Sequence, residues 1–529
     1  MRTITRRDLL RLSVGTVPLL TAAGLPLQAW ADSPSCRLPQ GTPSKRQLRG
    51  VWIATVANID WPSRPGLPVA QQQAELRSLL DTCAAARLNA VYFQIRSVAD
   101  AMFQTPYAPW SQYLTGTQGQ DPGYDPLAFA LEEAHRRNIE LHAWQNPYRA
   151  SLQTDITKLA PNHPARLHPD WVVVYGRQLW FDPGIPAARR FLEDSILDPI
   201  ARYDVDGLHF DDYYYPYPVA GTPFPDDASY ARYGGGFPDR GDWRRQNVNL
   251  LISELHDRVH RIKPWIKFGV APFGVWRNRA TDSTGSATTA GAQDYDDLYA
   301  DTRTWIRNQW LDYIAPEIYW SIGFAPAAYD VLVPWWSEEV AGTTVSLLVG
   351  EAAYKIGTST QAPAWSDPEE MPRHLALDAS YPAVTGNIYF SMKSMVANPL
   401  GFTTRLEEDL YRNPALVPVM PSLGGRAPAP VRLLAARRTD QGVALAWVPR
   451  PGSAPAVSFA VYRFPGHVPH AACDFDDPSH LIASLRGVAG ANPQTYIDTT
   501  AQTGAFTYYV TALDRLDHES PPGDAATVG

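Results

Sequence analysis

Strand-like and helix-like segments alternate along most of the chain, and this alternation limits the possible folds more than any other feature. Eight short, largely apolar segments have the pattern of buried strands: residues 48–56, 89–96, 139–144, 205–210, 267–273, 311–319, 344–351 and 385–390. Helical spacing occurs at residues 69–87, 126–137, 186–203, 242–263, 295–309, 327–340 and 368–380. Because the strands are apolar on both faces, they predict an α/β fold, a closed parallel (β/α)8 barrel of the TIM type rather than an open sheet.

The pattern changes towards the C-terminus. Residues 418–430 are rich in proline and glycine, which predicts a linker. Beyond it, short alternating strands occur without helices, most clearly at residues 443–447, 459–463 and 507–512. We therefore expect a barrel over residues 48–417 and an all-β sandwich over residues 431–529.

The N-terminus has the features of an export signal. Residues 1–31 contain the pair Arg6-Arg7, an apolar stretch and an Ala-Trp-Ala cleavage pattern that ends at Ala31. A twin-arginine signal of this kind directs a folded protein out of the cytoplasm. We expect residues 32–47 to form a leader and the mature chain to be periplasmic or secreted. No later apolar run is long enough to span a bilayer, so we expect no transmembrane segment in the mature chain.

Charge and cysteine content argue against two kinds of ligand. The 529 residues include 46 Lys and Arg against 54 Asp and Glu, and a net charge of −8 disfavours nucleic acid as a partner. Cys36, Cys83 and Cys473 are far apart and have no metal-ligand spacing, so we expect neither a metal nor another cofactor. Cys36 also lacks the preceding leucine that is typical of a lipidated cysteine, which disfavours a lipid anchor.

Carboxylates stand at the predicted C-terminal ends of three strands. Asp211 and Asp212 follow strand 205–210 and lead into a tyrosine-rich loop, while Glu317 and Glu351 lie at the ends of two later strands. In such a barrel the C-terminal strand ends meet at the catalytic face. Glycoside cleavage needs one carboxyl group to protonate the departing oxygen and another to stabilise or attack the sugar carbon, or to activate water. The sequence therefore predicts a glycoside hydrolase, with Asp211 or Asp212 paired with Glu317.

Strand alternation separates the side chains that face the helices from those that face the barrel axis. Glu351 is the weakest catalytic candidate, because it is in phase with apolar residues of its strand. Polar groups on the axis side of a buried strand need a partner or a function. The 17 Trp and 26 Tyr residues also fit a protein that stacks aromatic rings on sugars. The resulting substrate-binding candidates are Trp52, Trp61, Gln94, Arg96, His142, Trp144, Asn146, His209, Tyr213, Tyr215, Tyr319 and Trp320.

Several blocks of the barrel segment resemble one known family. They include Arg49-Gly50-Val51-Trp52, Asn58-Ile59-Asp60-Trp61-Pro62, Phe93-Gln94-Ile95-Arg96, His142-Ala143-Trp144-Gln145-Asn146-Pro147-Tyr148-Arg149, Asp206-Gly207-Leu208-His209-Phe210-Asp211-Asp212-Tyr213 and Tyr313-Ile314-Ala315-Pro316. On these blocks the chain resembles the glycosyl-hydrolase-10-like bacterial proteins. The resemblance adds Asn58 and Arg149 to the substrate-binding candidates. It implies a barrel that acts on bacterial cell-wall glycan, in particular peptidoglycan strands stripped of their peptides.

The C-terminal segment resembles a fibronectin type III module, with Trp447, Tyr462 and residues 508–514 in fitting places. We expect this module to be a spacer, or a docking site for cell-wall or division proteins, rather than part of the catalytic unit. Its deletion is then expected to leave the cleavage of small substrates nearly intact.

One position departs from the family pattern, because we expect glutamine where this chain has Glu317. If Glu317 is not essential, the catalytic pair is Asp211 with Asp212 or with Glu351. Adjacent aspartates are also similar to those of enzymes in which the acetamido group of the substrate is the nucleophile, a route that needs one acid and one orienting carboxylate. Retaining, inverting and substrate-assisted mechanisms all stay open from the sequence.

Two other functions fit the same residues. One is an exported hydrolase of environmental polysaccharide such as xylan or α-galactan. The other is a catalytically inactive carbohydrate-binding barrel that scaffolds cell-wall enzymes, which would keep the aromatic platforms and tolerate the loss of acids. Alanine at Asp211 and at Asp212 separates an enzyme from a scaffold, because only an enzyme loses glycan turnover.

Overall fold

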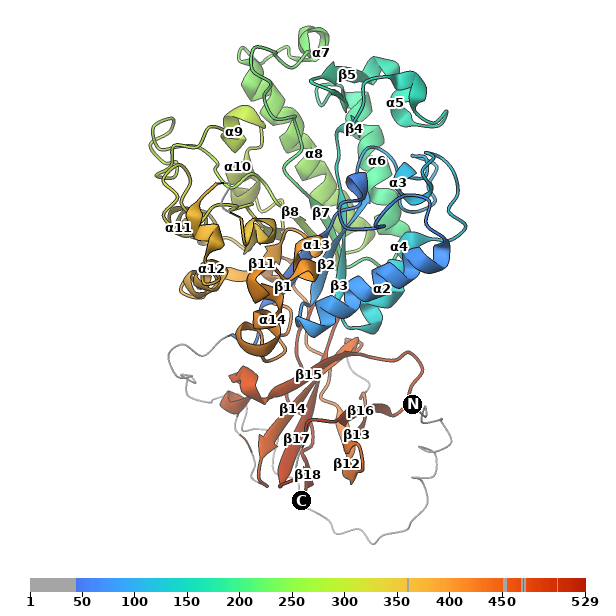
Figure 1. Ribbon diagram of the computed structural model, residues 1–529, viewed down its shortest axis with the longest axis vertical. Coiled ribbons are helices and arrows are strands. Elements are labelled where there is room, and N and C mark those ends of the chain that lie inside the picture. Colours follow the sequence, from blue (N-terminus) through green and yellow to red (C-terminus); the bar gives the residue numbers. More distant parts are fainter. Residues whose placement is uncertain (1–43, 359–360, 451–453, 468–469, 471, 502) are drawn as a thin grey trace.

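A computed structural model describes residues 44–529 except 359–360, 451–453, 468–469, 471 and 502 (Figure 1). The predicted signal segment, most of the predicted leader and Cys36 lie outside the described residues. Among the described residues, no helix combines the length and apolar character needed to cross a membrane.

Eight parallel strands form a closed barrel, which confirms the predicted fold class. Around the barrel, the strands follow the order β1-β11-β10-β9-β8-β7-β3-β2. Their bounds are β1 (Leu48–Ile53), β2 (Ala90–Arg96), β3 (Glu140–Gln145), β7 (Gly207–Phe210), β8 (Lys267–Val270), β9 (Tyr313–Ile314), β10 (Ser346–Glu351) and β11 (Val384–Tyr389). The first and last strands, β1 and β11, pair in parallel from Leu48↔Gly386 to Val51↔Tyr389 and so close the cylinder.

Helices surround the barrel (Figure 1). The longer ones are α2 (Val69–Ala85), α4 (Pro126–Arg136), α6 (Pro186–Arg202), α8 (Arg240–Ile262), α11 (Tyr329–Glu339) and α12 (Glu370–Asp378). Local sequence sets where they begin: Asp125 caps α4 by accepting a hydrogen bond from Ala128 N, and Pro126 occupies the first turn, where its missing N–H costs nothing. Shorter helices include α3 (Gln112–Thr115), α13 (Met392–Ala397) and α14 (Phe402–Arg405).

Strand β2 shows how the two faces of the barrel wall differ. Val91, Phe93 and Ile95 pack in the outer core beneath the helices, while Tyr92 belongs to the inner cluster of the barrel. Gln94, on the same side as Tyr92, is fully buried and accepts hydrogen bonds from the backbone at the end of β1. The predicted alternation therefore gives the correct faces.

Two predicted elements differ most from the structure. The helix expected over residues 295–309 is split into α9 (Asp294–Asp297) and α10 (Thr302–Arg307), because Tyr299 has a positive φ of 54° and Asp301 caps a new helix. The strand expected over residues 311–319 is reduced to β9. Pro316 has no N–H for the strand ladder, and pairing resumes at Glu317 as isolated bridges to Phe273 and Gly350.

A small antiparallel sheet was not predicted from the sequence. It has the order β4-β6-β5, with bounds β4 (Arg149–Ser151), β5 (Val172–Tyr175) and β6 (Gln178–Phe181). Together with α5 (Pro164–Leu167) and α7 (Asp227–Tyr233), it lies beyond the C-terminal ends of β3 and β7 (Figure 1). These insertions cover one side of the barrel at the C-terminal ends of its strands.

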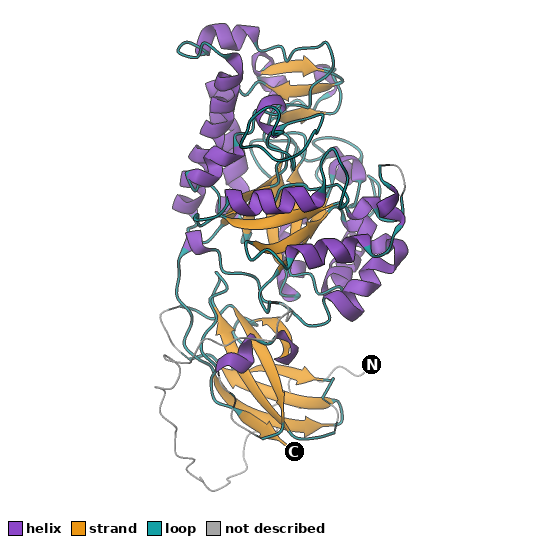
Figure 2. Ribbon diagram, turned by 90° about the vertical axis from the view of Figure 1, so that its left-hand side faces the viewer, coloured by secondary structure: helices purple, strands orange, loops and turns teal. Residues whose placement is uncertain are grey.

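The C-terminal segment forms two antiparallel sheets below the barrel (Figure 2). One contains β12 (Arg432–Thr439), β13 (Gly442–Val448) and β16 (Gln494–Asp498); the other contains β14 (Ser458–Pro465), β15 (Leu481–Arg486), β17 (Phe506–Leu513) and β18 (Ala526–Val528). Trp447 and Phe459 face each other between the sheets with ring centroids 5.3 Å apart. The fibronectin type III identity of this module remains a prediction from the sequence.

Candidate active site

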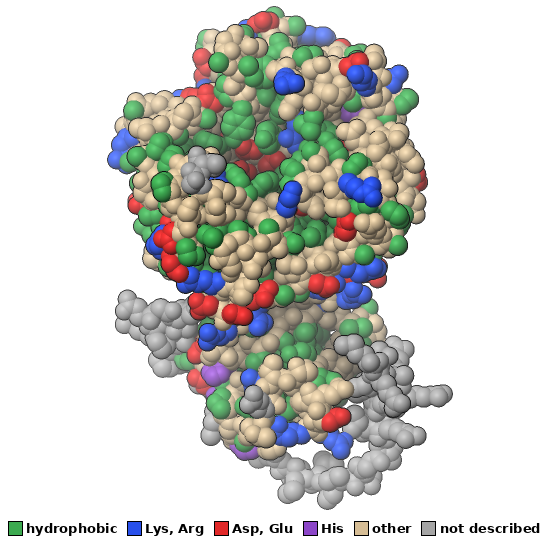
Figure 3. Space-filling model, in the orientation of Figure 1, with side chains coloured by type: hydrophobic (Ala, Val, Ile, Leu, Met, Phe, Trp, Pro, Cys, Tyr) green, Lys and Arg blue, Asp and Glu red, His purple; other side chains and the backbone are tan. Residues whose placement is uncertain are grey.

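A cavity of about 340 Å³ opens at the C-terminal ends of the barrel strands, within the usual size range of ligand pockets. Figure 3 shows a hollow on this face with acidic side chains at its floor and hydrophobic side chains around it. Its lining residues are Trp52, Ala54, Val56, Ile59, Gln94, Trp144, Arg149, Asp211, Asp212, Tyr213, Tyr217, Glu317, Tyr319, Tyr354 and Phe390. The cavity therefore brings together three of the four predicted acids.

Asp211 is held by several donors directly after β7. Asn146 Nδ2 lies 2.6 Å from both carboxylate oxygens, and Trp144 Nε1 donates to Oδ2 at 3.2 Å. The backbone N–H of Tyr213 donates to Oδ1 at 3.2 Å. Burial raises the pKa of Asp211, while the charge of Arg149 and the hydrogen bond from Asn146 act in the opposite direction. Of the two adjacent aspartates, Asp211 has more hydrogen-bond donors to stabilise a negative charge.

Asp212 has a less supportive environment. The hydroxyl of Tyr217 donates a hydrogen bond to its Oδ2 atom, and its side chain is 5% exposed. Burial and then the charge of Asp211 raise the pKa of Asp212 to about 7. Two neighbouring carboxyl groups in different hydrogen-bonding environments are suited to two different roles in acid catalysis.

Glu317 faces the two aspartates from the end of β9. Burial, followed by the charges of Asp212 and Asp211, raises the pKa of Glu317 well above its ordinary value. Its backbone is fixed by a hydrogen bond from Glu317 N to Pro272 O at 2.9 Å. Glu317 is therefore a third carboxyl group of the cavity whose charged form is disfavoured by burial and by the two aspartates.

Amide and guanidinium groups hold the acidic floor in place. Gln94 Nε2 donates to Asn146 Oδ1 at 2.8 Å, which turns the amide nitrogen of Asn146 towards Asp211. Arg149 Nη2 also donates to Asn146 Oδ1, at 3.2 Å, and Arg149 Nε donates to Ser97 O. The Arg149 guanidinium lies 4.7 Å from the centre of the Tyr213 ring, so it is fixed on two sides.

Aromatic rings make up much of the cavity wall. Of the predicted platforms, Trp52, Trp144, Tyr213 and Tyr319 line the cavity. Tyr217, Tyr354 and Phe390 line it too but were not among the predicted binding residues. Phe390 follows β11 directly, so its place at a strand end was a usable signal. Tyr354 lies in a short helical turn after β10 that the strand pattern does not reveal.

Glu351 does not line the cavity, although it ends β10. Its carboxylate accepts hydrogen bonds from Tyr329 Oη at 2.6 Å and Asn387 Nδ2 at 3.1 Å, and lies 3.0 Å from His374 Nδ1. It is fully buried on the helix side of the barrel wall, the side that its phase in the strand indicates. Glu351 is therefore separate from the three acids that line the cavity.

Several substrate-binding candidates lie away from the cavity. Asn58 and Trp61 follow β1 and donate to the backbone carbonyls of Pro62, Tyr113 and Gln72. Arg96 donates to the carbonyls of Asn146 and Pro147. Tyr215 packs against Phe224 and Tyr299, and Trp320 packs against Phe273. His142 and His209 lie inside the barrel beneath Trp52, with both rings next to Tyr313. These side chains support the site without lining it.

No group of three or more His, Cys, Asp or Glu side chains within the described ranges is arranged to hold a metal ion. Cys83 is buried with a free thiol.

A barrel that gathers buried carboxyl groups in an aromatic cavity at its C-terminal strand ends is a glycoside hydrolase-like protein. The chain belongs to the glycosyl hydrolase-like 10 family, whose sequence model matches residues 47–367. This result confirms the family expected from the sequence blocks.

Known proteins share much of this sequence. The chain is 48% identical to the glycosyl hydrolase YngK of Bacillus subtilis over 490 residues, which cover 92% of this chain and 94% of that protein. It is 38% identical to the glycosyl hydrolase DigH of Escherichia coli K12 over 394 residues, covering 70% of this chain and 89% of that protein. Among solved structures, the glycoside hydrolase domain of PgaB from Bordetella bronchiseptica matches with a TM-score of 0.43 and 14% identity, covering 68% of this chain and 98% of that one.

Proposed function

We propose that this protein is an exported glycoside hydrolase that cleaves bacterial cell-wall glycan, in particular peptidoglycan strands without peptides. One observation carries the proposal: Asp211 and Asp212 are adjacent in an aromatic-lined cavity, yet only Asp211 is surrounded by hydrogen-bond donors. This asymmetry separates a charged carboxylate from a protonated acid, which is the requirement for glycoside cleavage.

Asp212 is the general acid in this proposal. With a pKa of about 7, its carboxyl group holds a proton at neutral and lower pH and transfers it to the glycosidic oxygen as the bond to the anomeric carbon breaks. The leaving sugar departs as a neutral alcohol, and Asp212 becomes a carboxylate. A water molecule that later attacks the anomeric carbon returns a proton to Asp212.

Asp211 is the orienting carboxylate rather than the nucleophile. Asn146 donates to both of its oxygens, and Trp144 and Tyr213 N add further hydrogen bonds, which stabilise the anion and lower its tendency to attack carbon. Such an anion can accept a hydrogen bond from the N–H of a 2-acetamido group and aim the acetamido oxygen at the anomeric carbon. The substrate then supplies its own nucleophile, and the configuration of the sugar is retained.

The cavity wall fits an N-acetylated and acidic glycan. Trp52, Trp144, Tyr319 and Tyr354 present rings on which sugar faces can stack. Arg149 is the one cation among the described residues that line the cavity, and its guanidinium can pair with a carboxylate such as the lactyl group of muramic acid. Peptide-free peptidoglycan carries both the acetamido groups and this carboxylate.

Export and docking complete the proposal. The twin-arginine pattern at Arg6-Arg7 supports export to the periplasm or beyond, where this glycan is found. The C-terminal module, which forms two antiparallel sheets, is the proposed contact for cell-wall or division proteins. We propose no nucleic-acid partner, because the chain has a net charge of −8.

Substrate comparison tests this function directly. Purified mature protein is incubated with peptide-free peptidoglycan strands, the same strands after removal of the N-acetyl groups, and plant polysaccharides, and the products are analysed by mass spectrometry. We expect cleavage of the N-acetylated strands only, with Asp211→Ala and Asp212→Ala as inactive controls. Cleavage of xylan or galactan instead would move the substrate class to environmental polysaccharide. Turnover equal to that of the wild type in both alanine variants would show that the catalytic site is elsewhere.

A further inference from the structure

A chain of hydrogen bonds runs along the barrel axis from the cavity to the C-terminal module. Trp52 Nε1 lies 3.0 Å from His209 Nε2, and Tyr313 Oη lies 3.0 Å from Nδ1 of both His209 and His142. His142 Nε2 lies 3.1 Å from Glu140 Oε2. Lys267 Nζ then bridges Glu140 Oε1 at 2.5 Å and Asp517 Oδ2 of the module at 2.9 Å. The chain therefore joins the wall of the cavity to the opposite end of the barrel.

With both histidines neutral, the two ends of this chain fix the direction of every hydrogen bond in it. An indole N–H can only donate, and an ionised carboxylate can only accept. Trp52 therefore donates to His209 Nε2, and neutral His209 donates from Nδ1 to Tyr313. The Tyr313 hydroxyl donates to His142 Nδ1, so the remaining proton of His142 is on Nε2 and is donated to Glu140. Burial lowers the pKa of His209 well below its ordinary value, in agreement with a neutral ring.

The barrel backbone makes room for these rings. A Cβ atom on Gly207 would lie 2.3 Å from His142 Nδ1, and one on Gly269 would lie 2.3 Å from the Tyr313 ring. Both distances are too short for any side chain at these positions. Tyr92 packs beside the chain, with its ring centre 4.7 Å from that of His142 and 4.6 Å from that of His209. The rings are thus enclosed on several sides and have little freedom to reorient.

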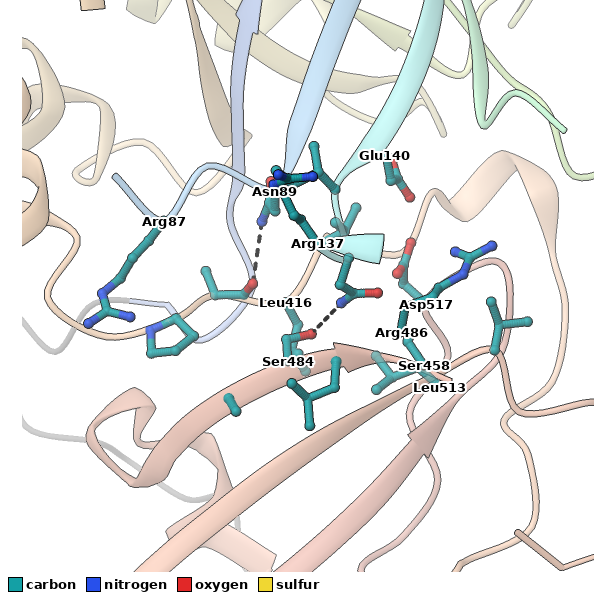
Figure 4. Close-up of a pocket in the computed structure, with 18 of the residues that line it drawn as sticks. Arg87, Asn89, Arg137, Glu140, Leu416, Ser458, Ser484, Arg486, Leu513 and Asp517 are labelled. Carbon is teal, nitrogen blue, oxygen red and sulfur yellow. Dashed lines mark hydrogen bonds between the residues drawn. The ribbon is translucent and has the colours of Figure 1, made fainter. Parts of the chain in front are cut away.

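A tight turn of the module supplies the last link. This turn, residues 514–518, follows β17; Asp514 Oδ1 accepts hydrogen bonds from the N–H groups of Leu516 and His518. Asp517 has a positive φ of 66°, a conformation that aspartate tolerates better than most residues. In Figure 4, the carboxylates of Glu140 and Asp517 face each other across the space between barrel and module. Arg515 of the same turn pairs with Asp204 at 2.6 Å.

The module completes the charge balance at Lys267. This ammonium group is 1% exposed although Lys267 is the first residue of β8, at the N-terminal end of the barrel. Burial lowers its pKa, but the charges of Asp517 and Glu140 outweigh this effect and hold the pKa above its ordinary value. Asp517, which shares the cation with Glu140, has its pKa raised to about 7, first by burial.

We propose that Asp517 is a positioning residue for the cavity: by holding Lys267 against Glu140, it keeps the axial chain in register and so fixes the indole of Trp52 in the cavity wall. The module then also supports the site, beyond the role of spacer or docking domain that the sequence predicts. The inference rests on the proposed function only for the sugar that Trp52 contacts.

The test uses the full chain and two independent readouts. NMR of protein labelled with ¹⁵N at histidine and tryptophan, with His142→Gln, His209→Gln and Trp52→Phe for assignment, reports ring tautomers and the Trp52 indole N–H. We expect His209 protonated on Nδ1 and His142 on Nε2. Kinetics on the cleaved glycan report KM and kcat separately.

Asp517→Ala is expected to shift the Trp52 N–H resonance and to raise KM about threefold or more while kcat changes by less than about twofold. Asp517→Asn keeps an acceptor for Lys267 and should show the same changes at smaller size. Tyr313→Phe, which interrupts the chain halfway, should move the Trp52 signal further. Asp524→Ala is the control, because Asp524 is an exposed module residue paired only with the exposed Arg450 among the described contacts.

Each outcome decides the proposal. Opposite tautomers, or a Trp52 signal and KM unchanged in folded Asp517→Ala, would overturn it. If Asp517→Ala does not fold, an unshifted Trp52 signal in Asp517→Asn overturns it equally. If wild-type protein cleaves no glycan, the proposed function fails, but the NMR readout still decides whether Asp517 positions Trp52.

Discussion

The two ends of the barrel both bury carboxyl groups, but the pKa values of the barrel's own carboxyl groups shift in opposite directions at the two ends. Asp517 of the module, at the N-terminal end, departs from this pattern because burial raises its pKa to about 7. At the N-terminal end, burial raises the pKa of Glu140, yet the charge of Lys267 and the hydrogen bond and charge of His142 together outweigh burial, and the pKa falls below its ordinary value. Asp206 is similar: the charge of His135 is the largest of the effects that overcome burial and lower its pKa. At the C-terminal end, burial prevails, and the pKa values of Asp211, Asp212 and Glu317 are all raised.

This difference separates structural from functional charge. Carboxylates with close cations satisfy each other and stabilise the fold, whereas acids left with raised pKa values in an accessible cavity are kept ready for a ligand. Burying carboxyl groups of this second kind lowers the stability of the fold at that place, as is common at active sites. Substitutions at the two ends should therefore have opposite effects on stability and activity.

The largest expected effect is on turnover at the C-terminal end. Asp212→Asn removes the proposed general acid, and kcat should fall by about 10²–10⁴-fold. Stability should change the other way. Because the pKa of Asp212 is raised to about 7, its contribution to stability is full below its ordinary pKa and is lost as pH rises through about 7. Asparagine cannot ionise, so the variant should gain in unfolding free energy over wild type with increasing pH, measured by urea unfolding at pH 5 and pH 8.

At the N-terminal end, Lys267→Met should mainly cost stability. It leaves Glu140 and Asp517 as buried like charges without their cation, which should lower the unfolding free energy by about 3–5 kcal/mol. Urea unfolding measures this loss. Lys158→Met is the matched control: Lys158 is 75% exposed in its pair with Asp155, so the change should stay within about 0.5 kcal/mol. A small loss in Lys267→Met would mean that the two ends do not differ as described.

The smallest effect is expected at Glu317. Burial, followed by the charges of Asp212 and Asp211, raises its pKa and disfavours its charged form, and Glu317→Gln keeps an uncharged hydrogen-bonding group of similar shape. We expect kcat/KM to stay within about tenfold of wild type, whereas Glu317→Leu, which has no polar group, should lose more. A loss in Glu317→Gln as large as in Asp212→Asn would instead identify Glu317 as a member of the catalytic pair.

Much of the fold and the acidic floor follows from sequence periodicity. The eight strand segments were predictable because buried parallel strands are apolar along nearly their whole length. Alternation then places Gln94, Asn146 and Asp211 on the axis side. The same rule gave the warning about Glu351, whose hydrogen bonds to Tyr329 and Asn387 lie on the helix side.

Alternation gives the face of a side chain but not its depth along the barrel. His142 and His209 were therefore predicted to bind substrate, although they lie one layer beneath Trp52. Tyr354 and the β4-β6-β5 sheet were missed because irregular connections and short strands carry no sustained period. The link from Lys267 to Asp517 joins positions 250 residues apart, and no local pattern reports such a contact.

The pH dependence of kcat/KM on peptide-free glycan tests the central claim most directly, that a protonated Asp212 beside an ionised Asp211 performs the cleavage. Since burial and the charge of Asp211 raise the pKa of Asp212 to about 7, the rate should fall about tenfold per pH unit above that value. A rate that is constant or rises between pH 6 and pH 9 would contradict the account.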